Sequence, residues 1–209
     1  MSQFDSLSDT RTDSLRCSSA ATLTAYLLLG GDFGAVAREL GVKPKLTYEN
    51  LHRVQDEDLT LGVAMTDAKG DRSKRPGAQA NPDVYVRISE RRRDGIVIRG
   101  TKAIVTGAPY MHEILVLPCR AMTEADKDFA VACAVPIGAE GVTISSRPAG
   151  RPGGKAAAFS GKYGQALGAI FFDDVFVPHE RVFLDGEWRH SEFLTRSYAT
   201  HHRHTCIGA

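Results

Sequence analysis

The stretch VYVRISERRRDGIVIRG, residues 84–100, shows the pattern that decides the fold. Apolar and polar side chains alternate from Val84 to Ile88, and Asp94-Gly95 then provides a residue pair typical of a tight hairpin turn. A second apolar run, 96–98, follows the turn directly. This pattern predicts two strands joined as an antiparallel hairpin.

Further short apolar runs continue on the C-terminal side of this hairpin, punctuated by Gly, Pro and Asp. They are 103–105, 114–117, 129–135, 142–144 and 169–177. Because no helical pattern separates them, they predict an antiparallel sheet or barrel. Helical spacing is found before and after this region. We therefore predict an α+β fold with a partial N-terminal helical region (1–58), a β-domain (59–184) and the truncated start of a C-terminal helical domain (185–209).

Composition narrows the class of protein further. The chain has 209 residues, with 26 Lys+Arg against 25 Asp+Glu and a net charge of +1. This balance gives no electrostatic reason to expect nucleic acid or an anionic membrane as a partner. The 4 Cys are scattered without a CxxC pair, which argues against a zinc ribbon or a disulfide framework. The apolar run 23–29 is shorter than the ~20 residues of a membrane span. We predict a cytoplasmic protein.

Three short segments carry the evidence for chemistry: AMTDAKGD (64–71), GTKAIVTG (100–107) and FDDVFVP (172–178). They resemble, in this order, the A-x-T-E-P-x-A/G-S-D loop and the G-x-K-x-x-I-T-N and F-x-D-V-x-V-P strands of acyl-CoA dehydrogenases. The longer stretches AMTDAKGDRSK, RGTKAIVTGAP and AMTEADKDFAV, with the late HHRH, resemble one flavoprotein family. That family joins 4-hydroxyphenylacetate 3-hydroxylase to 4-hydroxybutyryl-CoA dehydratase (vinylacetyl-CoA isomerase).

The resemblance implies an acyl-CoA dehydrogenase-like fold with an antiparallel, β-barrel-like middle domain. It also implies FAD as cofactor and a homotetramer, in which missing helices and a neighbouring subunit complete the flavin site. Family members have longer helical domains on both sides of the β-domain. We therefore expect this chain to be a fragment of a longer protein.

Five residues are the candidate cofactor-binding positions under this resemblance: Met65, Thr66, Asp67, Thr106 and Gly107. An isoalloxazine ring needs an apolar wall and a few polar groups at its edge. The 65–67 loop can offer backbone N–H groups and a hydroxyl, and Gly107 permits close approach of the backbone. Turn capping and sheet packing are the alternative roles of the two threonines.

His202 is the candidate catalytic residue, because an imidazole near the flavin titrates in the range useful for proton transfer. A hydrogen-bonded structural histidine is the alternative. The dehydratase branch carries a four-iron four-sulfur cluster, held by a C-x-x-x-C pair and a late His followed seven residues on by a Cys. Here Ala209 follows His202 at that spacing, and Asp13 stands where Cys17 needs a partner. We predict no cluster and no metal.

The sequence offers two further candidate sites. His202 and Cys206 share a helix face and could bind a single metal ion with a neighbouring His. The basic loop at Arg151, Lys155 and Lys162 could hold a phosphate of FAD or CoA. We interpret the first as a packed helix face and the second as a flexible loop.

The predicted function is that of an FAD-dependent monooxygenase acting on a phenolic substrate, with a separate flavin reductase as partner. The first alternative is acyl-CoA chemistry of the dehydratase or isomerase type, which the local motifs favour. The second alternative is a non-catalytic remnant, because the C-terminal helices that complete such a site are largely missing from the sequence.

Overall fold

The computed structural model describes residues 52–148, 164 and 166–207. Most of the predicted N-terminal helical region therefore lies outside the described residues, as do Asp13, Cys17, Ala209 and the basic loop with Arg151, Lys155 and Lys162. The side chains of His202 and Cys206 lie outside them as well, although both positions belong to a helix. The domain boundaries at 58 and 184 stay predictions.

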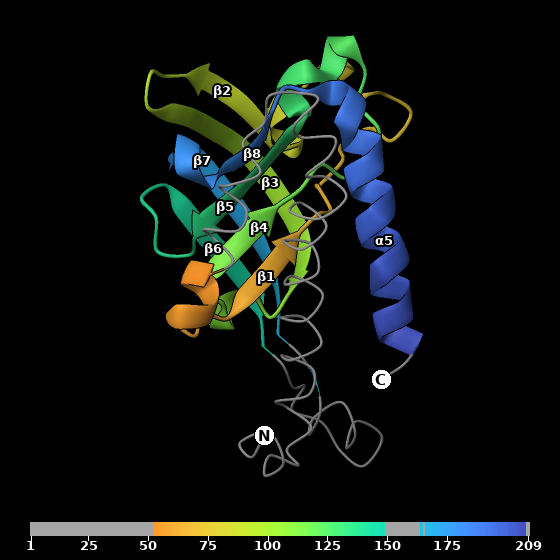
Figure 1. The fold of residues 1–209 in the computed structure, drawn as a ribbon. Coiled ribbons are helices and arrows are strands. Elements are labelled where there is room, and N and C mark those ends of the chain that lie inside the picture. The colour runs from red at the N-terminus through yellow and green to blue at the C-terminus, as the bar shows by residue number, and fades with distance from the viewer. Residues whose placement is uncertain (1–51, 149–163, 165, 208–209) are drawn as a thin grey trace, which may run out of the picture.

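Eight strands form two four-stranded sheets (Figure 1). The first sheet has the order β1-β4-β5-β8, with β1 Leu61–Ala64, β4 Glu113–Val116, β5 Val131–Pro136 and β8 Val182–Asp185. The second has the order β2-β3-β7-β6, with β2 Arg87–Arg91, β3 Gly95–Thr106, β7 Leu167–Pro178 and β6 Val142–Arg147. The apolar runs of the sequence thus form strands, as predicted.

The predicted hairpin is confirmed between β2 and β3, where the Arg92 amide donates to the Gly95 carbonyl at 2.8 Å. All but one of the strand pairs are antiparallel. The exception is β1, which pairs in parallel with β4. The chain leaves the first sheet after β1, forms the β2–β3 hairpin in the second sheet, and returns beside β1. Such a long crossover is what a parallel pair requires. In the described residues the strands form two sheets and no closed barrel.

The first sheet lies between two apolar layers. Alternate residues of its strands, such as Ile114 and Cys133, pack with Ile98 and Val175 of the second sheet. The intervening residues pack on the other side with the α5 helix, Ser191–Ile207, through Leu194. The order of layers is therefore second sheet, first sheet, helix (Figure 1).

The start of α5 is fixed to the loop after β4 by side-chain hydrogen bonds. The Ser191 hydroxyl, fully buried, accepts from the Met122 amide at 2.8 Å and donates to the Trp188 carbonyl at 2.6 Å. One turn later the Thr195 hydroxyl donates to the Pro118 carbonyl at 3.1 Å. The helical segment predicted within 185–209 is thus present from Ser191. Among the described residues, no helix has the length and apolar character to cross a membrane.

Candidate functional site

The loop after β1, residues 65–67, lies against the middle of β3. The Ala103 amide donates to the Thr66 carbonyl at 2.8 Å, and the Ala68 amide donates to the Thr101 carbonyl at 3.4 Å. An isolated bridge also joins Asp67 to Lys102. Two of the three recognised segments, far apart in the sequence, are therefore brought together, as the proposed site requires.

A buried ion pair fixes this loop. Lys102 Nζ lies 2.7 Å from Asp67 Oδ1, and each side chain is only 2% exposed. The ammonium also donates to the Met65 carbonyl at 3.0 Å and the Leu117 carbonyl at 2.7 Å, which uses all three of its donors. Asp67 Oδ1 further accepts from the Val86 amide at 3.0 Å. Asp67 thus positions the loop, and its predicted contact with a cofactor stays a prediction.

The C-terminal half of β3 presents an apolar side chain at the surface. Ile104 has a left-handed φ of 59° and is 71% exposed, because the pairing of β3 with β7 shifts register between Lys102 and Val105. Thr106, two residues on, is exposed as well. A depression of about 510 Å³ opens at Ile104, and its other lining residues are Ser145, Ser146, Arg147, Pro148, Leu167, Gly168 and Ala169. An exposed isoleucine in a left-handed conformation is unusual and indicates a contact surface.

Gly107 ends β3 with a φ of 74°, which a side-chain-bearing residue adopts only at a cost. Its amide donates to the Ala166 carbonyl at 2.8 Å, which ties the end of β3 to the start of β7. Thr106 lies three residues beyond Ala103, on the far side of the irregularity at Ile104. Along β3, Ile104 therefore lies between Ala103, which is bonded to the 65–67 loop, and Thr106.

The predicted cofactor-binding residues are thus brought to one region of the fold. Met65 and Thr66 are half-buried, Asp67 and Gly107 are buried, and Thr106 is exposed. No finding tests their contact with a cofactor, so they stay predictions, as does His202. The sequence analysis missed Ile104 and Lys102. The sequence carries no signal that Lys102 is buried, because lysines are almost never fully buried unless paired.

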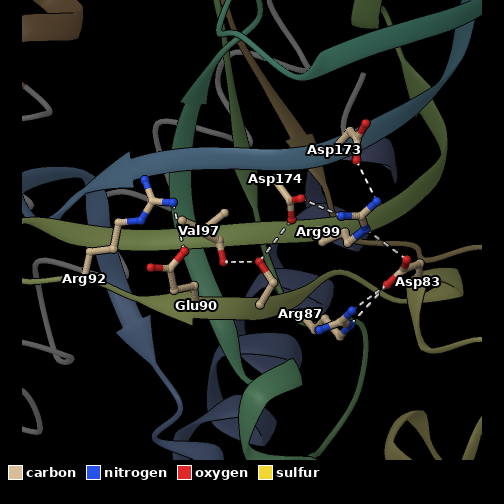
Figure 2. Close-up of polar contacts among 9 residues, drawn as sticks. Asp83, Arg87, Glu90, Arg92, Val97, Arg99, Asp173 and Asp174 are labelled. Carbon is tan, nitrogen blue, oxygen red and sulfur yellow. Dashed lines mark hydrogen bonds and ion pairs between the residues drawn. The ribbon is translucent and has the colours of Figure 1, made fainter.

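A separate charged cluster occupies the surface of the second sheet and neutralises itself (Figure 2). Arg99 lies between Asp83, Asp173 and Asp174, with nitrogen–oxygen distances of 3.1, 2.8 and 2.6 Å. The hydrogen bond and charge of Asp174 raise the pKa of Arg99 above its usual value. Arg92 is similarly paired with Glu90 at 2.8 Å. Because carboxylates already face these guanidinium groups, the cluster is poorly suited to bind a further anion.

Among the described residues, no group of three or more His, Cys, Asp or Glu side chains is placed to hold a metal ion. The metal alternative with His202 and Cys206 concerns side chains beyond that part of the chain.

The chain is similar to known proteins in family pattern, in sequence and in structure. A family model described as "4-hydroxyphenylacetate 3-hydroxylase N terminal" matches residues 33–184. The 4-hydroxybutyryl-CoA dehydratase/vinylacetyl-CoA-Δ-isomerase of Clostridium aminobutyricum is 40% identical over 167 residues, which are 77% of this chain and 34% of that protein. The 4-hydroxyphenylacetate 3-monooxygenase oxygenase component of Thermus thermophilus is 28% identical over 183 residues, which are 86% of this chain and 35% of that protein. The chain therefore spans about a third of the length of these curated relatives.

Solved structures agree with these matches. An oxygen-tolerant archaeal 4-hydroxybutyryl-CoA dehydratase from N. maritimus superposes with a TM-score of 0.84 at 30% identity, over 95% of this chain and 42% of that one. The oxygenase component of 4-hydroxyphenylacetate 3-monooxygenase in complex with FAD gives a TM-score of 0.70 at 24% identity. The match covers 93% of this chain and 39% of that one. The second likeness supports the fold alone. A glutaryl-CoA dehydrogenase also shares this fold, with a TM-score of 0.58.

Proposed function

The chain belongs to the 4-hydroxyphenylacetate 3-hydroxylase family, and on this premise we propose that it forms the flavin-binding β-domain of an FAD-dependent monooxygenase that acts on a phenolic substrate. The observation that carries the proposal is the surface made by Ile104 and Thr106 beside the fixed 65–67 loop. The acyl-CoA dehydrogenase-like fold expected from the sequence is the fold of the structural neighbours.

The residues present fit a flavin. Ile104 offers an apolar wall, and Thr106 two residues on and Thr66 in the loop bonded to Ala103 are the threonines that would offer hydroxyl groups. Gly107 lets the backbone approach closely, and the Lys102–Asp67 pair holds the loop in one conformation. When bound and reduced, FAD supplies the electron pair for hydroxylation of the phenol by O₂, whose second oxygen atom leaves as water.

His202 is proposed to transfer the proton of the phenol, because a histidine changes charge near neutral pH. It lies on α5, whose first turns are anchored to the loop after β4 by Ser191 and Thr195. The proposed partners are a separate flavin reductase and further copies of the full-length protein. A cytoplasmic location is also proposed, supported by the scattered cysteines.

A second candidate function is dehydration of 4-hydroxybutyryl-CoA or isomerisation of vinylacetyl-CoA. Two observations favour it: the 40% identity to the Clostridium aminobutyricum enzyme and the TM-score of 0.84 to the archaeal dehydratase. Both values exceed those for the monooxygenases reported above. Isomerisation requires an acid and a base beside the flavin, and the same surface and His202 would serve it.

The two reactions are separated by one set of assays on the chain loaded with FAD. Phenol-dependent oxygen uptake in the presence of a flavin reductase and NADH supports the monooxygenase, and it should be lost in Thr106→Val. Conversion of vinylacetyl-CoA to crotonyl-CoA without oxygen uptake would support the second candidate function and contradict the monooxygenase. FAD binding without either turnover would identify a non-catalytic remnant.

A further inference from the structure

A second cavity, of about 370 Å³, lies next to the buried Lys102–Asp67 pair. It is lined by Lys69, Arg72, Tyr85, Cys119 and Arg120. The lining comes from three segments: the turn after the 65–67 loop, the residue Tyr85 before β2, and the segment that follows β4. Three of the five lining residues carry a permanent positive charge near neutral pH, and none is a carboxylate.

Within the described part of the chain, these three charges have no acidic partner. Among the residues that the structure describes, ion pairs were found for Arg75, Arg92 and Arg99 but for none of the three cavity cations. The arrangement is the opposite of the cluster in Figure 2, where each of the arginines drawn faces a carboxylate. A cavity with unopposed guanidinium groups has a positive potential that favours an anion.

The nearby aspartates are already occupied. Asp67 is neutralised by Lys102 at 2.7 Å. Asp71, in the turn itself, accepts from the amide and the hydroxyl of Ser73 at 3.0 and 2.7 Å, and these bonds lower its pKa. It also faces Lys74 at 3.8 Å. Neither carboxylate is therefore available to pair with Arg72.

The two remaining lining residues stay neutral at physiological pH. Burial, followed by the charge of Asp67, raises the pKa of Cys119 to about 11. Burial is the largest cause that raises the pKa of Tyr85, and the charge interaction with Cys119 is the second. The hydrogen bond and the charge of Arg120 act in the opposite direction but do not cancel this shift. The cavity thus keeps its positive charge across the neutral range.

The turn that carries two of the cations is held rigidly. Gln79 bridges it, with its amide nitrogen donating to the Asp71 carbonyl at 2.7 Å and its amide oxygen accepting from the Asp71 amide at 3.0 Å. Lys69 has a left-handed φ of 73°, and its amide donates to the Val84 carbonyl at 3.1 Å. A preorganised set of cations binds an anion with less loss of conformational entropy.

We propose that this cavity binds the diphosphate group of an adenine nucleotide, held between Arg72 and Arg120 with Lys69 as a third cation. The inference rests on the proposed function, under which both FAD and CoA carry such a diphosphate. It assigns the phosphate to residues other than the basic loop at Arg151, Lys155 and Lys162 considered from the sequence.

Calorimetric titration of the purified chain tests the proposal with inorganic pyrophosphate and ADP as probes. The variants are Arg72→Gln, Arg120→Gln and their double, with Arg92→Gln as a matched control on the exposed face of the second sheet. A charge-assisted hydrogen bond is strong enough that each cavity substitution should weaken ADP binding by about tenfold. Arg92→Gln should leave it unchanged, and higher salt should weaken the wild-type affinity.

A second series of titrations, with FAD, riboflavin and CoA as ligands of the wild-type chain and the double variant, identifies which cofactor carries the diphosphate. Weaker FAD binding in the double variant, with riboflavin unchanged, assigns the cavity to the flavin. Weaker CoA binding with FAD unchanged assigns it to the acyl carrier. Absence of pyrophosphate and ADP binding to the wild-type chain overturns the proposal, and so does an affinity in the double variant within twofold of wild type. If flavins do not bind but the double variant loses pyrophosphate, the flavin function fails and the anion site stands.

Discussion

Lys102→Met is the substitution with the largest expected effect on stability. It removes the ammonium from a pair in which both side chains are 2% exposed. The Met65 and Leu117 carbonyls lose their donor, and Asp67 keeps only uncharged partners, the Val86 amide and Cys119. Breaking a buried pair from one side costs about 3–5 kcal/mol, because it leaves an uncompensated charge. We expect a loss of unfolding free energy in that range.

The reason for the loss is tested by a second variant. Asp67→Asn combined with Lys102→Met removes the charge but keeps an oxygen for the Val86 amide, so it should recover about 2 kcal/mol of the loss. Urea denaturation followed by circular dichroism measures both values. Lys74→Met is the control, because that lysine is 49% exposed and should change stability by less than about 0.5 kcal/mol. A cost below about 1 kcal/mol for Lys102→Met, or no recovery in the double variant, would refute the role assigned to the pair.

Three further predictions concern other parts of the β-domain. Burial acts to raise the pKa of Asp126, but hydrogen bonds, that of Thr123 the strongest, lower it overall. Its contribution to stability is therefore complete above the pKa of about 4 in the unfolded chain and is lost as the pH falls below it. The urea midpoint of wild type should drop there more than that of Asp126→Asn, and equal drops would count against this. Gly100→Ala should lower the melting temperature by several degrees, because φ is 130° and a β-carbon would collide with the Tyr85 carbonyl; an unchanged melting temperature would be inconsistent with this backbone. Cys119, with a pKa of about 11, should resist iodoacetamide at pH 7.5 in peptide mapping, and rapid labelling would show the thiol to be exposed.

The strands that depend on local pattern were predictable from the sequence. The Asp94-Gly95 turn lies in the β2–β3 hairpin as predicted, but β2 begins at Arg87, and Val84 of the predicted strand ends a 3-10 helix. The parallel pairing of β1 with β4 was not predictable, because it depends on a crossover that no local pattern records. The division into two sheets depends on the same long-range pairing.

The candidate site shows the same limit. The three recognised segments located the 65–67 loop and β3, and the structure places the loop against the middle of that strand. The exposure of Ile104 results from a register shift against β7, which is a property of the pairing and not of either strand alone. Lys102 would ordinarily be placed at the surface, since lysines are almost never fully buried unless paired. The basic cavity joins Lys69 and Arg120, which the sequence separates by a whole hairpin.

The central claim is that the surface at Ile104 and Thr106 binds a flavin, and FAD titration of wild type and Ile104→Asp tests it most directly. Because Ile104 is 71% exposed, the substitution should leave the melting temperature nearly unchanged. Placing a charge against the apolar ring should weaken FAD binding at least tenfold, as measured by quenching of flavin fluorescence. Equal affinities in wild type and variant, with both proteins folded, would contradict the assignment of this surface to the flavin.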